Sequence, residues 1–155
     1  METVGLGRYF EELAVGTKFK TIGRTITETD IINFVNCTGM VEVLFTNAEY
    51  LKHESVIKGR VAPGPLVYAM SEGLLFQSTL QHTGLAFLEM EFKVHGPVLA
   101  GDTIHVEVEV IEATSRPDRP GRGKVRTRNQ IVKQDGTVAM TYTPARFIKC
   151  RPVSE

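Results

Sequence analysis

The chain has 155 residues, 42% of them hydrophobic, which is enough for one domain with a substantial core. Lys and Arg number 18, as do Asp and Glu, so the charge gives no indication of nucleic-acid or acidic-membrane partners. The two cysteines lie far apart, and no apolar run has the length of a membrane span or the pattern of a signal peptide. We therefore expect a cytoplasmic protein.

The N-terminal part predicts a turn, a strand and a helix in that order. Residues 8–16 read as a lead-in that ends in a turn at Gly16, and residues 18–25 alternate as a strand does. The stretch from Thr27 to Asp30 has the spacing of a helix capping box, and Gly39 is placed to end the helix that follows.

An apolar segment from Met40 to Phe45 comes next and contains one acid, Glu42. Burial in this segment would raise the pKa of Glu42 toward neutrality and suit it to acid/base work. The alternative is a carboxylate that is hydrogen-bonded within a loop or faces solvent. A second capping-box spacing from Thr46 to Glu49 predicts a short helix to about His53.

A long helix is predicted from Pro65 to Leu80, 16 residues that would span about 24 Å. Pro65 suits a first helical position, because its ring presets φ and no N–H is needed there. The following residues are apolar on most sides, so we expect this helix to be largely buried. Backbone N–H groups near Gly64 could hold a carbonyl oxygen or an anion, and the alternative is a core helix with no further role.

The second half of the sequence has strand character. Residues 85–94, 103–112, 124–133 and 137–149 predict strands, residues 114–123 a basic loop and residues 134–136 a tight hairpin. Helices that come before strands indicate an α+β protein. We expect a single hot-dog domain over residues 1–155, with its core at 8–149, in which an antiparallel sheet wraps around the long helix.

Several segments resemble MaoC-like dehydratases, a hot-dog family that includes the (R)-specific enoyl-CoA hydratases. The similar segments, which together run from about Arg8 to Lys149, are Tyr9–Gly16, Gly23–Phe34, Thr38-Gly39, Thr114–Arg126 and Gln134–Met140. The resemblance implies addition of water to a 2-enoyl thioester, or removal of water from a 3-hydroxyacyl thioester, carried on CoA or on an acyl carrier. It also implies dimers with a pocket between the subunits.

The chain departs from the family at the residues that move protons. Met40 and Phe45 stand where the resemblance places the family's Asp and His, and neither side chain can carry a proton. Pro63-Gly64 stands where the family often has His-Gly, so Gly64 is retained as the donor to the thioester carbonyl. Whether the protein is an enzyme stays open, and a hydro-lyase is the activity that the resemblance implies.

Glu42 and Gly64 are therefore the predicted catalytic residues. Six further residues are predicted to contact the substrate: Met40, Phe45, Pro63, Pro65, Tyr68 and Arg116. Arginines of the late loop could bind CoA phosphates, and a solvated loop is the alternative. Tyr68 could instead hydrogen-bond within the core. The four histidines lack metal-ligand spacing, so neither a metal nor a cofactor is expected.

Three functions remain open from the sequence. The first is a divergent acyl-CoA hydratase or dehydratase in which Glu42 replaces the lost acid. The second is a non-catalytic subunit that binds an acyl thioester and completes the site of a catalytic homologue in a heterodimer. The third is a hot-dog thioesterase with Glu42 as base or nucleophile. We expect a homodimer or higher homo-oligomer, with a heterodimer with a catalytic homologue as the alternative, and neither nucleic acid nor membrane as a partner.

Overall fold

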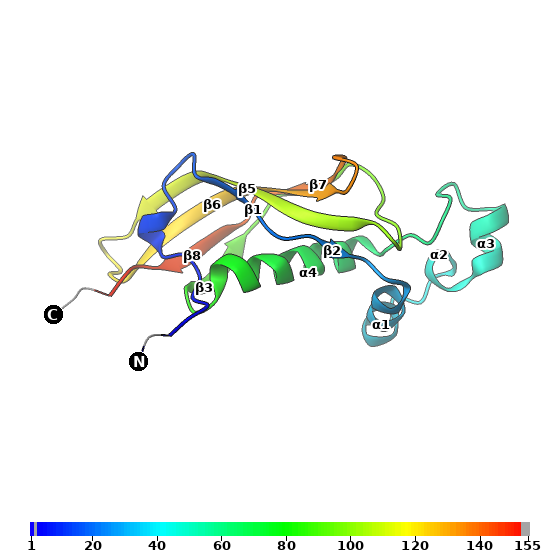
Figure 1. Ribbon diagram of the computed structural model, residues 1–155, viewed down its shortest axis with the longest axis horizontal. Helices are drawn as coiled ribbons and strands as arrows, with labels where there is room; N and C mark the ends of the chain where they lie inside the picture. Colours follow the sequence, from blue (N-terminus) through cyan, green and yellow to red (C-terminus); the bar gives the residue numbers. More distant parts are fainter. Residues whose placement is uncertain (2, 153–155) are drawn as a thin grey trace.

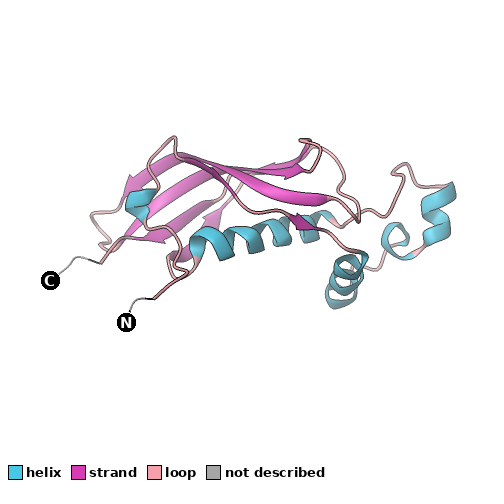
Figure 2. Ribbon diagram, in the orientation of Figure 1, coloured by secondary structure: helices cyan, strands magenta, loops and turns pink. Residues whose placement is uncertain are grey.

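An eight-stranded antiparallel sheet and one long helix form the body of the molecule (Figures 1 and 2). The computed structural model describes residues 1 and 3–152. The helix lies along one face of the curved sheet, and three smaller helices project beyond its N-terminal end (Figure 1). The predicted α+β hot-dog arrangement is thus confirmed. Within the described residues, none of the helices is long and apolar enough to cross a membrane.

The sheet contains eight strands, but they lie in only five positions across the sheet, because three of these positions are each occupied by two shorter strands placed end to end. The strands are β1 (Lys18–Lys20), β2 (Arg24–Thr25), β3 (Gly84–Glu89), β4 (Phe92–Val94), β5 (Thr103–Ser115), β6 (Arg122–Lys133), β7 (Val138–Tyr142) and β8 (Ala145–Lys149). Both β1 and β2 pair with β5, and both β7 and β8 pair with β6. At the other edge β4 pairs with β7, and β3 with β8. All five predicted strand segments are present, and bends divide three of them in two.

These bends let the sheet curve around the helix. Pro144 lies between β7 and β8, where its missing N–H removes a ladder hydrogen bond. The preceding residue, Thr143, donates its N–H to the carbonyl of Glu91 at 3.0 Å, in the gap between β3 and β4. Irregular pairing in β5 and β6 adds further twist. The loop between β5 and β6 is shorter than predicted, because both strands extend into residues 114–123.

The long helix, α4 (Gly64–Leu75), begins one residue earlier than predicted and continues as a π-helical turn, η2 (Phe76–Leu80). Pro65 is therefore its second residue, where a missing N–H is equally harmless. The helix buries five apolar side chains against the sheet: Leu66, Val67, Met70, Leu74 and Leu75. Burial of each such side chain contributes about 1.5–3 kcal/mol, so this contact dominates the core.

The strand β5 confirms the predicted alternation of buried and exposed side chains. Four alternate residues of β5 form the buried face beneath α4: Ile104, Val106, Val108 and Val110. The side chains between them are partly or fully exposed, as a two-faced strand requires.

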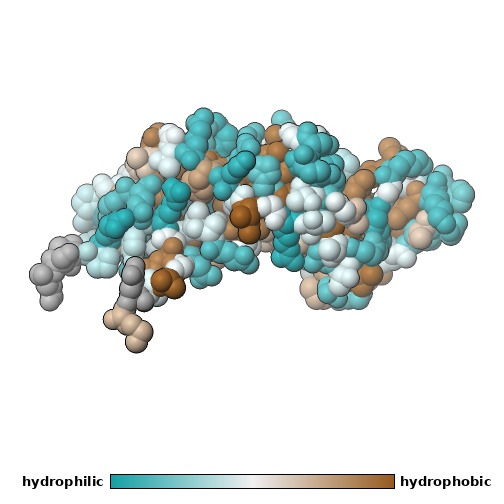
Figure 3. Space-filling view, viewed as in Figure 1, coloured by the Kyte–Doolittle hydropathy of each residue, from teal (hydrophilic) through white to brown (hydrophobic). Residues whose placement is uncertain are grey.

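The opposite side of α4 is uncovered in the single chain, which corrects the prediction of burial on most sides. Pro65, Ala69 and Phe76 are exposed there. The neighbouring strands β3 and β4 are exposed along their whole length. The face drawn in Figure 3, by contrast, is mostly hydrophilic, and its hydrophobic patches are separated from one another.

Four short helices complete the fold: η1 (Phe10–Glu12), α1 (Glu28–Thr38), α2 (Val43–Thr46) and α3 (Ala48–His53). The α1 capping box is confirmed, since Thr27 Oγ1 accepts from the N–H of Asp30 at 3.1 Å and Asp30 Oδ2 accepts from the N–H of Thr27 at 2.8 Å. The predicted box at Thr46 is wrong. Thr46 ends α2, and Asn47 caps α3 by accepting from two backbone N–H groups.

The packing of η1 against β6 yields a stability prediction. Gly123 of β6 is buried, and a Cβ at this position would overlap the ring of Phe10. We expect Gly123→Ala to lower the free energy of unfolding by about 1–3 kcal/mol through overpacking. Urea unfolding measures this, with Gly96→Ala as the control, because a Cβ at Gly96 meets no atom within 4 Å. Combining Gly123→Ala with Phe10→Ala should relieve the overlap, so the double variant should lose less stability than the sum of the two single variants. Strictly additive losses of unfolding free energy would contradict the overlap with Phe10.

Candidate active site at the start of the central helix

The N-terminus of α4 is the position that the sequence marked as a donor site. Pro63 caps the helix in an extended conformation, with φ −52° and ψ 132°, and Gly64 is the first helical residue. Amide N–H groups of a first turn have no carbonyl partner within their own helix. Because Gly64 is the first residue of α4, its N–H lies at the positive end of the helix dipole. In the chain Pro63 is buried, Gly64 half-buried and Pro65 exposed.

A short backbone ladder positions this helix start. The N–H of Ala62 donates to the carbonyl of Val98, and the N–H of Ala100 donates to the carbonyl of Arg60, both at 2.8 Å. The segment that leads into Gly64 is thereby held against the loop before β5. Two anchors, Asp102 and Arg60, fix this ladder to the rest of the molecule.

Asp102 is the first anchor, and it is buried. Its Oδ2 accepts from the N–H of Leu99 at 2.8 Å and lies 3.0 Å from Nζ of Lys133, while its Oδ1 accepts from Gln134 Nε2 at 2.8 Å. Burial acts to raise the pKa of Asp102, but these hydrogen bonds and the Lys133 charge outweigh it and hold the pKa below its usual value. This role of Asp102 was not predicted from the sequence, although an acid between apolar segments was the available signal.

Arg60 is the second anchor, and it holds α1 and α2 to the body. Its Nε donates to Glu28 Oε1 of α1 at 2.7 Å, and its Nη1 donates to the carbonyl oxygen of Phe45. A hollow of about 380 Å³ between α1 and α3 is bordered by Arg60, Phe45 and the apolar side chains Ile32, Val35 and Leu51. In Figure 1 this group of helices lies at the same end of the molecule as the start of α4.

The segment between α1 and α3 does not bury Glu42, which corrects the sequence expectation. Glu42 is exposed, and its Oε2 accepts from the N–H of Leu44 at 2.7 Å, so that it caps α2. Met40 and Phe45 are half-buried, and the Phe45 ring packs against the core. The apolar run therefore forms a small helix with an acidic cap.

A buried polar network lies further along α4 and was missed by the sequence analysis. Glu72 pairs with Arg146, and it accepts from the Tyr142 hydroxyl at 2.9 Å. Burial, together with the Glu72 charge, raises the pKa of Tyr142 above its usual range. Tyr68 packs edge-on against Tyr142, with ring centroids 5.2 Å apart, and burial also raises its pKa. An acid in an apolar helix was the available signal, since a buried charge requires a partner.

Arg116 lies apart from the other predicted site residues. It is in the turn between β5 and β6, at the opposite end of the sheet from Gly64 (Figure 1). Its guanidinium makes two hydrogen bonds to Asp118, at 3.0 and 2.8 Å. Within one chain Gly64 and Arg116 therefore do not form a single site. Among the described residues, no three His, Cys, Asp or Glu side chains gather in a way that could hold a metal ion.

A curved antiparallel sheet around a long helix defines the hot-dog class of proteins. Residues 11–134, most of the chain, match the family model described as the MaoC like domain. The chain therefore belongs to the MaoC-like family of hydratases and dehydratases. It is 27% identical over 113 residues to Protein MaoC from Klebsiella aerogenes, an overlap of 72% of this chain and 33% of that protein. The chain thus spans a third of the length of that relative.

Solved structures show the same fold. The MaoC-like dehydratase from Rhodospirillum rubrum superposes with a TM-score of 0.80 at 27% identity, over 95% of this chain and 100% of that one. R-hydratase PhaJ1 from Pseudomonas aeruginosa has a TM-score of 0.72 at 23% identity, over 95% and 92%. The HadBC (3R-hydroxyacyl-ACP dehydratase) complex from Mycobacterium tuberculosis has a TM-score of 0.67 at 20% identity, over 86% and 96%. The last two show likeness of fold alone.

The anchor at Asp102 yields a prediction about pH. Because its pKa is lowered by folding, Asp102 stabilises the fold above the ordinary carboxyl range, and this stabilisation is lost as the pH falls through the folded pKa. We expect Asp102→Asn to lower the free energy of unfolding at neutral pH by about 1–3 kcal/mol. We also expect a smaller loss of stability than in wild type between about pH 6 and pH 3.

Urea unfolding at several pH values measures both effects. The control is Glu54→Gln, which removes one negative charge as Asp102→Asn does, but from an exposed carboxylate. An unchanged pH dependence in Asp102→Asn would show that other carboxylates govern the acid stability.

Proposed function

We propose that the chain binds an acyl thioester at the start of α4 and catalyses hydration of a 2-enoyl thioester, or the reverse dehydration of a 3-hydroxyacyl thioester. The observation that carries this proposal is the N–H of Gly64 at the positive end of α4 in a MaoC-like fold. The family to which the chain belongs, and the dehydratase from Rhodospirillum rubrum that it resembles, support the reaction class.

The proposed role of Gly64 follows from where charge develops. When the oxygen of water attacks the β-carbon, electrons move from the double bond through the α-carbon to the thioester oxygen, and an enolate forms. A fixed N–H donor stabilises this charge more in the transition state than in the bound substrate. Pro63 and Pro65 stiffen the backbone on both sides of Gly64, so the donor is pre-organised.

The proton steps need a base, and Glu42 is the carboxylate that the sequence places nearest to the family's catalytic segment. In the proposed reaction the Glu42 carboxylate takes a proton from the attacking water and returns it to the α-carbon, so that water is added across the double bond. Met40 and Phe45, which occupy the family's acid and histidine positions by resemblance, would contact the acyl group. Since Glu42 is exposed in one chain, the proposed reaction would need a second chain to enclose this site.

We propose that the second chain joins at β3. Along this edge and the adjoining strand and helix, five large apolar side chains are 40–50% exposed: Phe76, Leu85, Phe87, Leu88 and Phe92. An open edge with this much exposed apolar surface favours pairing with another strand. A homodimer would place two copies of α4 in one assembly, and a partner's late loop could then supply Arg116 to the phosphates of a CoA thioester.

A second candidate is a non-catalytic thioester-binding subunit. The observation in its favour is that Glu42 already serves as the cap of α2, while Met40 and Phe45 are half-buried in the chain. Such a subunit would bind the acyl group and leave proton transfer to a homologous partner. The HadBC complex, which shares the fold, is composed of two different chains by its name.

The role of Gly64 can be tested by removing its N–H alone. Gly64→Pro deletes the donor at a helix start where proline is accepted, and the ψ of Pro63 at 132° suits a following proline. Gly64→Ala keeps the donor, and its Cβ would lie 3.8 Å from Met140 Cε, an ordinary contact.

We expect Gly64→Pro to reduce kcat for hydration of crotonyl-CoA by about 100- to 1000-fold, and Gly64→Ala to stay close to wild type. Loss of absorbance of the enoyl thioester measures the rate. Equal activities of the two variants would argue against a carbonyl contact at this N–H.

The role of Glu42 separates the candidate functions. Glu42→Gln keeps an oxygen that can cap α2 but removes the base, so we expect hydration to be abolished while binding of crotonyl-CoA persists. The matched control is Glu49→Gln, an exposed acid of the neighbouring helix α3.

Other outcomes identify the alternatives. Binding without turnover by the wild-type protein, with hydration on addition of a homologue that has the Asp and His, supports the non-catalytic subunit. Release of free CoA, detected with a thiol reagent, supports a thioesterase. No binding of any CoA ester would exclude all three functions.

A further inference from the structure

Two basic side chains lie side by side at the end of the sheet that is remote from Gly64. They are Arg122, the first residue of β6, and Lys149, the last residue of β8. The two residues are directly opposite each other in the antiparallel pairing of these strands. Side chains of such a pair leave the same face of the sheet, with Cβ atoms about 5 Å apart. The backbone therefore holds the two cations together.

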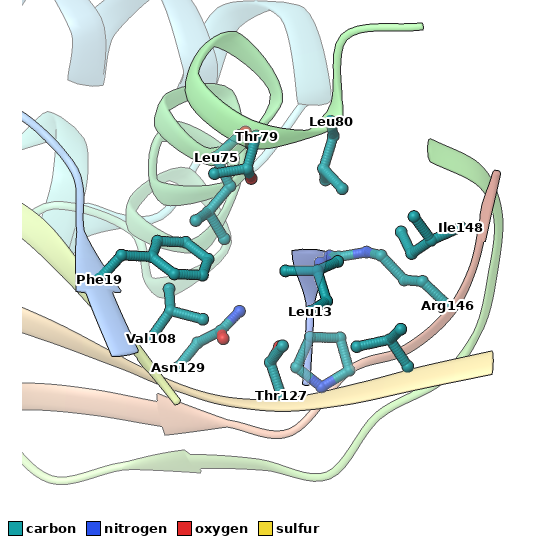
Figure 4. Close-up of a pocket in the computed structure, with 12 residues that line it drawn as sticks. Leu13, Phe19, Leu75, Thr79, Leu80, Val108, Thr127, Asn129, Arg146 and Ile148 are labelled. Carbon is teal, nitrogen blue, oxygen red and sulfur yellow. Dashed lines mark hydrogen bonds between the residues drawn. The ribbon is translucent and has the colours of Figure 1, made fainter. Parts of the chain in front are cut away.

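The burial pattern shows which face of the sheet carries this pair. Arg146 and Ile148 of β8 are buried and border a small cavity beneath the end of the central helix (Figure 4). Gly123 of β6 is buried as well. Because successive side chains of a strand point to opposite faces, Arg122 and Lys149 lie on the outer face, away from the helix. Both are half-buried, so solutes can reach them.

Within residues 1 and 3–152, neither cation of this pair has an acidic partner, whereas the cations beside them do. Arg116 makes two hydrogen bonds to Asp118, and these lower the pKa of Asp118 to about 2, so the carboxylate stays charged and remains with Arg116. Lys124 lies 3.9 Å from Glu89. Like charges directly opposite each other destabilise a sheet. An anion between the two unpaired cations would remove this repulsion.

An aromatic ring fixes the position of Arg122. The guanidinium carbon of Arg122 lies 5.4 Å from the centre of the Phe147 ring, and that of Arg116 lies 5.9 Å from the same centre. Cations within about 6 Å of an aromatic ring centre are attracted to the ring. Because the Arg122 side chain is already ordered by this contact, binding of an anion costs less conformational entropy.

The pair suits a phosphate group better than a carboxylate. A phosphate monoester carries a charge of about −1.5 to −2 at pH 7 and has three strong acceptor oxygens. The guanidinium of Arg122 presents its N–H groups in a planar fork that matches two phosphate oxygens, and Lys149 adds a compact charge. A carboxylate has a single charge and would leave one of the two cations unbalanced.

The proposed pairing of two chains at β3 leaves this surface open. The strand β8 pairs with both β6 and β3, so it lies between them. A strand that is added at the free edge of β3 extends the sheet in its own plane. The outer face over β6 and β8 therefore stays accessible in such a pair.

We propose that Arg122 and Lys149 form a binding site for a phosphate group on the outer face of the sheet. Arg122 donates two hydrogen bonds to phosphate oxygens, and Lys149 donates a third from the neighbouring strand. The phosphate belongs either to a nucleotide, including the 3′-phosphate end of coenzyme A, or to free inorganic phosphate. Assignment to coenzyme A rests on the proposed function, whereas the site itself does not.

Calorimetric titration of the wild-type protein tests the site, at low ionic strength because salt screens exposed charges. The probes are adenosine 3′,5′-bisphosphate and inorganic phosphate, with adenosine as the blank. We expect saturable binding of the bisphosphate and no binding of adenosine. Tighter binding of the bisphosphate than of inorganic phosphate supports a nucleotide ligand, and equal binding supports free phosphate. Adenosine that binds as tightly as the bisphosphate would overturn the proposal.

Two variants and a control locate the phosphate. Arg122→Gln and Lys149→Gln should each weaken binding of the bisphosphate about tenfold, because charge-assisted hydrogen bonds are lost. Without ligand, each variant should have a Tm equal to or above that of wild type, because the repulsion between like charges is removed. Arg119→Gln removes one positive charge from the adjoining turn and should bind within about twofold of wild type. Unchanged affinity in Arg122→Gln or in Lys149→Gln, or an equal loss in Arg119→Gln, would overturn the proposal.

Kinetics with crotonyl-CoA decide whether the phosphate is that of coenzyme A. If it is, Arg122→Gln should raise the KM for crotonyl-CoA about tenfold more than the KM for crotonyl-pantetheine, which lacks the nucleotide. An equal effect on the two substrates would overturn the assignment to coenzyme A. A protein that binds the bisphosphate through Arg122 but does not hydrate crotonyl-CoA would contradict the proposed function and support the phosphate site.

Discussion

The contact between α4 and the sheet is the constraint on which the rest of the structure depends. The helix is too apolar to be stable alone, and its buried side chains need a surface that curves with it. Strands broken at Pro144 and irregular pairing in β5 and β6 produce that curvature. The same contact fixes where the helix begins, and hence where the N–H of Gly64 is presented.

Much of the fold follows from local patterns in the sequence. The capping box of α1 involves only the four residues from Thr27 to Asp30, so it could be predicted from the local sequence. The end of the same helix could also be predicted, because Gly39 adopts the left-handed conformation that glycine allows (φ 71°). The clean alternation of β5 likewise requires one buried face. The second cap could not be placed as reliably, because Thr46 and Asn47 are both good capping residues. The outcome there depends on where α2 ends, and short helices depend on tertiary packing.

The site was only partly predictable, because its geometry depends on residues distant in sequence. Gly64 could be identified from the prolines around it, whereas the role of Asp102 requires Leu99 and Gln134 to be brought beside it. The exposure of Glu42 was missed for a related reason. A run of apolar neighbours indicates burial only if another element covers the run, and within residues 3–152 no element covers Glu42. Glu72 is the opposite case, because another element does cover it. Its partner Arg146 lies in β8, the last strand, and the sequence gives no sign of which strand lies beside Glu72.

The division of one edge row into β3 and β4 limits how the molecule can assemble. A long, straight edge can add copies without end, because every new strand presents a fresh edge to the next. Here the bend turns β4 toward β7 and leaves at the edge the six residues of β3, whose pairing with β8 is irregular at two places. In a two-fold pair, one partner strand would pair with the whole of so short a segment, and the assembly would stop at two chains. In the proposed pair, the curvature that wraps the helix would therefore also prevent growth into filaments.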